Sequence, residues 1–151
     1  MTGVKTRARV LIKKHKGATM DSEERDNIKN LFLEHNISFD LYEDIEKLVI
    51  SSCKECSVDF TSNQAVFSVY GGFAYVWISE VQEDGSFKIV LSLCFNKKVE
   101  SSLFYSFEQC SDSNFMYHCL VCGEEDLNDE LKSYIKKAAE ISRVEYFKQI
   151  V

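Results

Sequence analysis

Residues 64–95 read QAVFSVYGGFAYVWISEVQEDGSFKIVLSLCF, and hydrophobic residues recur at every second position along much of this stretch. A period of two is typical of β-strands whose two faces meet different surroundings. The dipeptides Gly71-Gly72 and Asp84-Gly85 interrupt the pattern, and both accept the positive φ angles of a two-residue hairpin turn. The stretch therefore predicts three antiparallel strands, at residues 64–70, 73–81 and 86–95.

The two predicted turns also indicate which side chains share a face, because a two-residue turn would pair Tyr70 with Phe73 and Glu83 with Ser86. One face is aliphatic, and we expect it to form the core; it carries Ala65, Phe67, Val69, Ala74, Val76, Ile78, Ile89, Leu91 and Leu93. The other face is half aromatic and carries Val66, Ser68, Tyr70, Phe73, Tyr75, Trp77, Val90, Ser92 and Cys94.

The residues before this stretch predict two helices. Apolar side chains at helical spacing indicate a first helix that ends near Asn36, a residue that tolerates the left-handed conformation. Asp40 and Glu43 have the spacing of a capping box, which favours the start of a second helix. A helical hairpin is therefore expected over residues 21–57.

The residues after the stretch predict two more strands and a last helix. Segments 102–109 and 115–122 suit strands around a polar turn at 111–114, although the apolar residues of the first segment also suit a helix. Three acidic residues after Gly123 place negative charge where a helix would begin. The expected fold class is α+β, with an N-terminal helical hairpin, an antiparallel meander sheet of about five strands and a C-terminal helix.

Charge is distributed unevenly along the 151 residues, which carry 18 basic and 24 acidic side chains. Residues 1–19 hold six of the basic side chains and no acid, so residues 20–151 keep 12 basic and 24 acidic ones, a net charge of −12. We expect a basic, flexible tail over 1–19 and a single acidic domain over 20–151. A domain with this net negative charge repels nucleic acid and attracts basic partners. The tail alone would also suit organelle targeting or a nucleic-acid arm.

The six cysteines include two C-x-x-C pairs, Cys53/Cys56 and Cys119/Cys122. No segment is apolar enough for a secretory signal or a membrane span, so we expect a cytoplasmic protein with reduced thiols and no membrane association. The four paired cysteines could share one zinc ion and so support a protein-interaction module. Packing of free thiols in the core is the simpler interpretation, and neither a metal nor another cofactor is expected.

Motifs that indicate catalysis are missing from the sequence. The six glycines form neither a dinucleotide-binding fingerprint nor a P-loop, and no nucleophile elbow or zinc-protease motif occurs. His118 and Cys119 could form a base and a nucleophile, but adjacent strand residues point to opposite faces. We therefore expect a protein that is not an enzyme.

A compact acidic body with an aromatic sheet face suits a protein that binds and neutralises a basic partner. In composition and predicted architecture, residues 20–151 resemble the small acidic α+β immunity proteins that protect bacteria from toxins, although no diagnostic motif carries the resemblance. The resemblance implies a basic toxin domain, such as a nuclease, as the partner. The expected partner-binding residues are Tyr70, Phe73, Tyr75, Trp77, Glu80, Glu83, Asp84, Glu124, Glu125 and Asp126.

Overall fold

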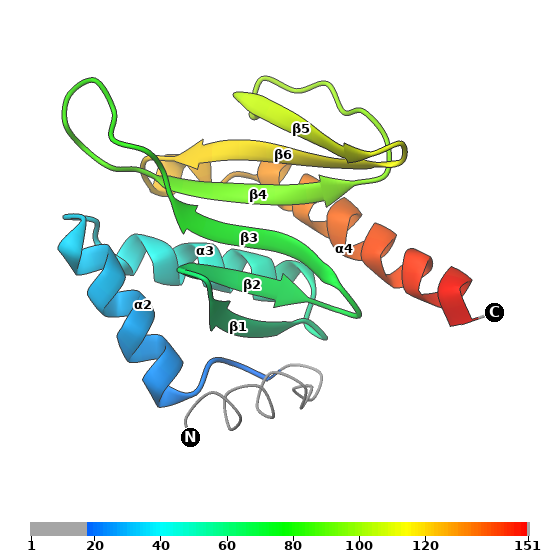
Figure 1. Ribbon diagram of the computed structural model, residues 1–151, viewed down its shortest axis with the longest axis horizontal. Helices are drawn as coiled ribbons and strands as arrows, with labels where there is room; N and C mark the ends of the chain where they lie inside the picture. The colour runs from blue at the N-terminus through cyan, green and yellow to red at the C-terminus, as the bar shows by residue number, and fades with distance from the viewer. Residues whose placement is uncertain (1–17, 151) are drawn as a thin grey trace.

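The computed structural model describes residues 18–150, and the side chains of residues 18–144. The predicted basic tail therefore lies almost entirely outside the described residues. The described chain has two N-terminal helices, a six-stranded antiparallel sheet and a C-terminal helix, which confirms the predicted α+β class (Figure 1). The elements are α2 (Ser22–Glu34), α3 (Phe39–Ser52), β1 (Ser57–Thr61), β2 (Gln64–Ser68), β3 (Gly72–Ile78), β4 (Ile89–Phe95), β5 (Ser106–Ser111), β6 (Asn114–Val121), a short 3-10 helix η1 (Glu124–Asp126) and α4 (Asp129–Ile150).

The strand order is β1-β2-β3-β4-β6-β5, so the sheet departs from the predicted meander after β4. Residues 96–105 carry the chain past the position next to β4 and out to the edge of the sheet. β5 forms that edge, and β6 returns between β5 and β4. The polar turn at 111–114 joins β5 to β6, as predicted.

Strand β1 was missed by the sequence pattern, which extended the second helix to residue 57. The helix ends at Ser52, and β1 then pairs with β2 through a two-residue turn. Ser62 and Asn63 both have positive φ angles, 51° and 59°, as a type I′ hairpin turn requires. Ser-Asn is a weaker turn signal than Asn-Gly, so the hairpin is visible only in the tertiary structure.

Both predicted two-residue turns are longer in the structure. Val76 lies directly opposite Leu91, whereas a two-residue turn at Asp84-Gly85 would have paired Val76 with Leu93, two residues further along β4. A shift of two residues keeps the side chains of residues 74–78 and 89–95 on their predicted faces, because the side-chain period of a strand is also two. The aliphatic face is therefore the core face, as predicted: its members are buried except Val69 and Ile78, which pack against the core.

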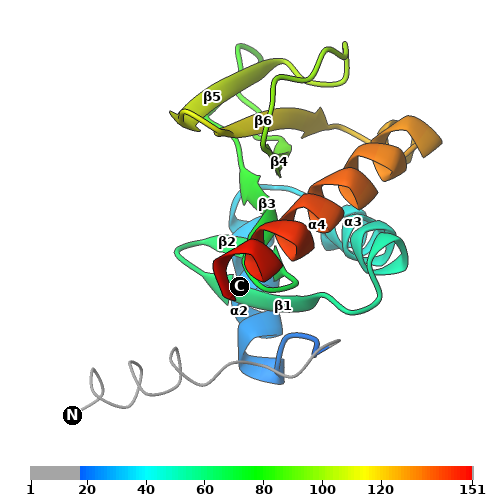
Figure 2. The ribbon, with the colours of Figure 1, turned by 90° about the vertical axis from the view of Figure 1, so that its right-hand side faces the viewer.

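Helices α3 and α4 cover this core face, and they lie behind the sheet in Figure 1 and on its right-hand side in Figure 2. Ile45 and Val49 of α3 and Leu131 and Ile135 of α4 are fully buried in the same cluster as the sheet. Burial of each such side chain stabilises the fold by about 1.5–3 kcal/mol. The opposite face carries no helix of the described chain.

Helix α2 packs beside β1, and Glu24 fixes the contact. One Glu24 carboxylate oxygen accepts a hydrogen bond from the backbone N–H of Asp21, within a capping box, and the other accepts one from Phe60 N–H of β1 at 2.8 Å. Asn36 has a φ of 57°, which confirms the predicted left-handed residue after the helix.

Two predicted helix starts were wrong. Helix α3 begins after Ser38 rather than at the Asp40/Glu43 pair, because Phe39 and Asp40 already lie in its first turn. The acidic residues after Gly123 form η1 instead of starting α4, which begins at Asp129. Among the described residues, no helix is long and apolar enough to cross a membrane.

Candidate partner-binding face

The sheet face opposite α3 and α4 is the candidate functional surface, and Figure 1 looks onto it. The strand register places two rows of side chains across β3, β4 and β6 on this face. One row is Trp77, Val90 and Leu120, and the next is Tyr75, Ser92 and His118. We call this surface the open face; with the flanking positions of β2, β4 and β6, its members are Val66, Ser68, Tyr75, Trp77, Val90, Ser92, Cys94, Met116, His118 and Leu120.

A chain of hydrogen bonds fixes the centre of the open face. The indole Nε1–H of Trp77 donates to Ser92 Oγ at 2.8 Å, and a hydrogen bond of 2.7 Å joins Ser92 Oγ to His118 Nδ1. An indole can only donate, so the Ser92 oxygen accepts from it and the hydroxyl hydrogen remains available for His118. The Trp77 and His118 rings meet edge to face, with centroids 5.8 Å apart. These contacts hold Trp77 in one orientation.

The second ring nitrogen of His118 faces a carboxylate at the surface. Glu108 Oε1 lies 3.8 Å from His118 Nε2, and the Glu108 side chain is 71% exposed. Burial lowers the pKa of His118, and the charge of Glu108 opposes this effect in part. His118 is consequently neutral near pH 7.

Serine, histidine and glutamate are also the components of a nucleophilic triad, but the geometry here favours a structural role. Ser92 is fully buried, and its hydroxyl oxygen is engaged by both Trp77 and His118. A nucleophile needs an oxygen that a substrate can approach. This set of side chains therefore positions the aromatic surface.

The acidic residues predicted for the site gather at one end of the sheet. Ile78 pairs with Ile89 and Ile89 with Val121, so β3 ends, β4 begins and β6 ends at the same place. The β3–β4 loop and η1 both leave the sheet there. The loop carries Glu80, Glu83 and Asp84, and η1 carries Glu124, Glu125 and Asp126; all are exposed except Asp126, which is half-buried.

Two of these carboxylates are engaged by their own loops. Asp84 accepts hydrogen bonds from the backbone and the hydroxyl of Ser86, which lowers the pKa of Asp84. Asp126 accepts from the backbone N–H groups of Cys122 and Gly123 and so stabilises η1. The carboxylates left for a partner are Glu80, Glu83, Glu124 and Glu125.

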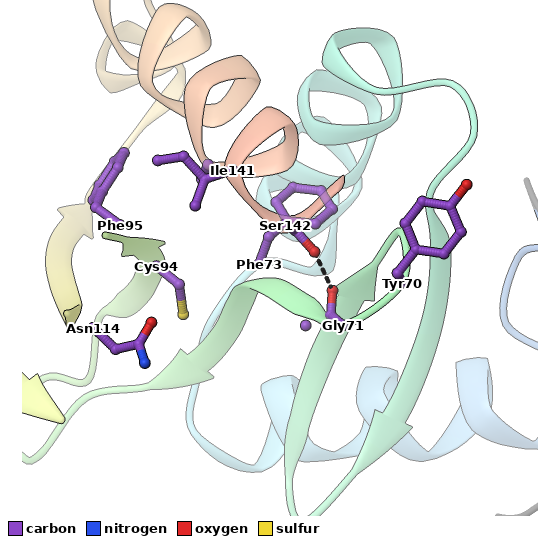
Figure 3. Close-up of a pocket in the computed structure, with 10 residues that line it drawn as sticks. Tyr70, Gly71, Phe73, Cys94, Phe95, Asn114, Ile141 and Ser142 are labelled. Atoms are coloured by element: carbon purple, nitrogen blue, oxygen red, sulfur yellow. Dashed lines mark hydrogen bonds between the residues drawn. The ribbon is translucent and has the colours of Figure 1, made fainter. Parts of the chain in front are cut away.

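Phe73 was wrongly assigned to the aromatic face. Phe67 pairs with Ala74 but Ser68 pairs with Gly72, so Phe73 is the extra residue of a β-bulge. The bulge turns its ring into the core beneath α4, where it is fully buried (Figure 3). Gly72 then lies on the open face, where a side chain would collide with the Tyr75 hydroxyl.

Tyr70 lies at the other end of β3, away from the acidic loop, beside a cavity of about 200 Å³. Ser142 Oγ of α4 donates to Gly71 O at 3.0 Å across this region (Figure 3). The cavity is smaller than the roughly 300–1,000 Å³ of typical small-molecule sites. Of the four predicted aromatic anchors, only Tyr75 and Trp77 lie at the centre of the open face, and both are half-buried.

Tyr105 and Glu108 belong to the same surface but were not predicted. The backbone N–H of Tyr105 donates to His118 O, and the Tyr105 ring lies 6.2 Å from the His118 ring. Tyr105 is 53% exposed, which is unusual for a large aromatic side chain. Tyr105 and Glu108 lie on the same face as Trp77 because β6 pairs with β4. The local pattern of residues 102–109 contains no signal for that pairing.

The cysteines do not form the shared zinc site that the two C-x-x-C pairs allowed. Within the described part of the chain, no three His, Cys, Asp or Glu side chains come together as potential metal ligands. Cys119 lies on the core face of β6, opposite to His118. Cys53 and Cys56 are buried at the turn between α3 and β1.

No protein-family model, no curated protein and no solved structure matches this chain.

Proposed function

We propose that this protein is a cytoplasmic, non-enzymatic inhibitor that binds and neutralises a basic protein, and that the partner is a bacterial toxin for which the chain acts as the immunity protein. A toxin that degrades nucleic acid fits best as the partner, because it needs positive charge to bind phosphate groups. An acidic inhibitor complements that charge.

The observation that carries the proposal is a group of aromatic and acidic side chains on and beside the open face. Trp77 and Tyr105 flank His118, and Glu108 lies at its exposed edge. Burial raises the pKa of Tyr105, a hydrogen bond with the Ser106 side chain lowers it, and the charges of Cys119, Glu80 and Glu108 raise it further, so both carboxylates contribute to the electrostatic environment of its hydroxyl. We call Trp77, Tyr105, Glu80 and Glu108 the aromatic–carboxylate patch.

This patch suits an arginine or lysine side chain of a partner. A guanidinium group stacks on aromatic rings and pairs with carboxylates at the same time. Such a contact desolvates the cation at the centre of an interface, where anchoring residues contribute most of the binding free energy.

Preorganisation supports the same function. Trp77 is held by Ser92 and His118 in the free protein, so binding does not have to order it. An immobilised aromatic anchor loses little conformational entropy on association. The remaining rim carboxylates and the net charge of −12 over residues 20–151 steer a basic partner towards the surface.

The proposal is tested by isolating the partner from source cells on the immobilised protein and then measuring binding kinetics with the purified partner. Trp77→Ala should increase the off-rate by roughly 30-fold or more. Leu33→Ala is the matched control, because Leu33 is an exposed apolar residue on α2, outside the open face.

The contribution of negative charge to binding is tested with a second pair of variants. Glu108→Gln should weaken binding, whereas Glu34→Gln on α2 changes the net charge equally and should leave binding nearly unchanged. A purified partner that is acidic, or whose binding responds equally to Trp77→Ala and Leu33→Ala, would contradict the proposal.

A further inference from the structure

Cys53 and Cys56 occupy a tight turn between α3 and β1. Cys53 is the C-cap residue of α3, and the backbone N–H of Cys56 donates to Cys53 O at 3.1 Å. A turn closed by such a bond brings its first and fourth Cα atoms within about 7 Å. Disulfides have Cα separations of roughly 4.4–6.8 Å, so this turn already has nearly the backbone geometry of a disulfide.

The two thiol groups also contact each other. A hydrogen bond links the Cys53 and Cys56 side chains, and it affects the two thiols in opposite directions. It lowers the pKa of Cys53 to about 7, with burial opposing and the charge of Arg143 assisting. The same hydrogen bond, with burial, raises the pKa of Cys56. Cys53 is therefore the more acidic of the two thiols and the one that attacks first.

Arg143 of α4 supplies the positive charge at this turn. Its guanidinium group pairs with Glu55, which lies between the two cysteines, and with Glu140 one turn earlier on α4. The ion pair with Glu55 fixes the guanidinium group beside the turn. A nearby cation is a common means by which proteins stabilise a reactive thiolate.

We propose that Cys53 and Cys56 form a redox-active dithiol that is oxidised to an intramolecular disulfide by low-molecular-weight disulfides. The Cys53 thiolate attacks one sulfur of the small disulfide, forms a mixed disulfide and releases the first small thiolate, which takes up a proton. Cys56 then loses its proton and attacks the Cys53 sulfur, which releases the second small thiolate. The balance is two cysteine thiols and one small disulfide to one protein disulfide and two small thiols.

The other C-x-x-C pair provides an internal comparison. Burial raises the pKa of Cys119 to about 11, and the nearby charges of Asp126 and Cys122 act in the same direction. The backbone N–H of Cys122 donates to Asp126. An anionic neighbour thus replaces the cation found beside Cys53, and the second pair should stay reduced under conditions that oxidise the first.

Burial sets the rate of the proposed reaction. Cys53 is 5% exposed and Cys56 is 2% exposed, so the small disulfide must reach Cys53 during local opening of the turn. The neighbouring side chains of Arg143 and Glu55 are about one-third exposed, which places the turn close to the surface.

The experiment is a redox titration of the folded, full-length protein in glutathione buffers. Samples are quenched with acid, alkylated and digested with chymotrypsin, since trypsin would cut at Lys54 between the two cysteines. The expected product is a peptide with Cys53 and Cys56 that has lost two hydrogens and carries no glutathione. Its fraction should rise from one-tenth to nine-tenths over an about 80-fold decrease in [GSH]²/[GSSG], the squared concentration of reduced glutathione divided by the concentration of oxidised glutathione.

Variants distinguish formation of the Cys53–Cys56 disulfide from non-specific oxidation of thiols. Cys56→Ser should stop at a glutathione adduct on Cys53, because the resolving thiol is missing. At pH 7, Cys53 should react with iodoacetamide at least about tenfold faster than Cys119. Arg143→Gln should slow that reaction by about two- to tenfold, whereas Arg143→Lys and Lys132→Gln should change it little.

The proposal is overturned if the pair stays reduced in every glutathione buffer, or if it oxidises only in denaturant. Equal oxidation of Cys119 and Cys122 over the same range would also overturn it. Stable adducts on Cys53 in the wild-type protein would show that the turn cannot close the disulfide.

Discussion

Replacement of Phe73 by alanine tests the side-chain assignment that the β-bulge changes. The ring is fully buried beneath α4, where it lines the same cavity as Ala138 and Ile141. Truncation of a buried phenylalanine costs about 3–5 kcal/mol. The existing cavity adjoins the ring, so fewer packing contacts are lost on truncation, and we expect a value near 3 kcal/mol.

Tyr75→Ala is the matched variant, because Tyr75 lies two residues away on the open face and is half-buried. Its cost should be about 1–2 kcal/mol. Urea unfolding followed by circular dichroism measures both variants. With a slope of about 2 kcal/mol per molar urea, the midpoint should fall by about 1.5 M for Phe73→Ala and by less than about 1 M for Tyr75→Ala.

A larger loss of stability for Tyr75→Ala than for Phe73→Ala would refute the assignment of Phe73 to the core. If Phe73→Ala does not fold, Phe73→Leu keeps the comparison possible, with an expected cost of about 1 kcal/mol. Tyr75→Phe should be close to wild type, because the ring remains and only the hydroxyl is lost.

Three further predictions concern the titration of His118, the partly buried hydrogen-bond network of Glu46 and association with the partner. Burial lowers the pKa of His118 from 6.5, so below about pH 6.5 the unfolded state takes up a proton that the folded state resists. The unfolding free energy should therefore decrease from pH 7 towards pH 5, with a smaller slope in His118→Gln; equal slopes in urea titrations would contradict this. Glu46 accepts hydrogen bonds from Arg25 and from the buried Tyr42 hydroxyl. Glu46→Ala should therefore lower the free energy of unfolding, measured in urea, by roughly 1–3 kcal/mol. A loss below about 0.5 kcal/mol would argue against this network. In surface plasmon resonance with the isolated partner, the on-rate should fall steeply with rising salt while the off-rate changes little; a salt-independent on-rate would argue against steering by the acidic body.

Sequence periodicity predicted the two faces of the central strands even though both turn registers were wrong. Ala74 and Val76 alternate with aromatic residues, and Ile89, Leu91 and Leu93 recur at every second position, which indicates the side chains that face the helices. The register error was two residues, which does not exchange the faces. The bulge at Phe73 was not predictable in this way, because one extra residue reverses the alternation without changing the composition.

The candidate site was predicted only in part, for a similar reason. The acidic residues at the end of the sheet follow from the chain order of strands and loops, since Glu80 and Glu124 each follow a strand that ends there. Tyr105 and Glu108 join the surface because β6 pairs with β4 and β5 pairs with β6. Local patterns contain no information about the order of strands that are joined by a ten-residue connection.

The sequence by itself determined the α+β class, the aliphatic core face and the acidic character of residues 20–151, because these depend on periodicity and composition within short segments. The tertiary structure decided which polar groups meet. Ser92 and His118 are 26 residues apart in the sequence but joined by a hydrogen bond. Arg143 of α4 pairs with Glu55, which lies in the turn between α3 and β1. Such contacts form only when the strands pair in their native register and α4 packs on the sheet. Their free energies depend on atomic positions that the whole fold determines.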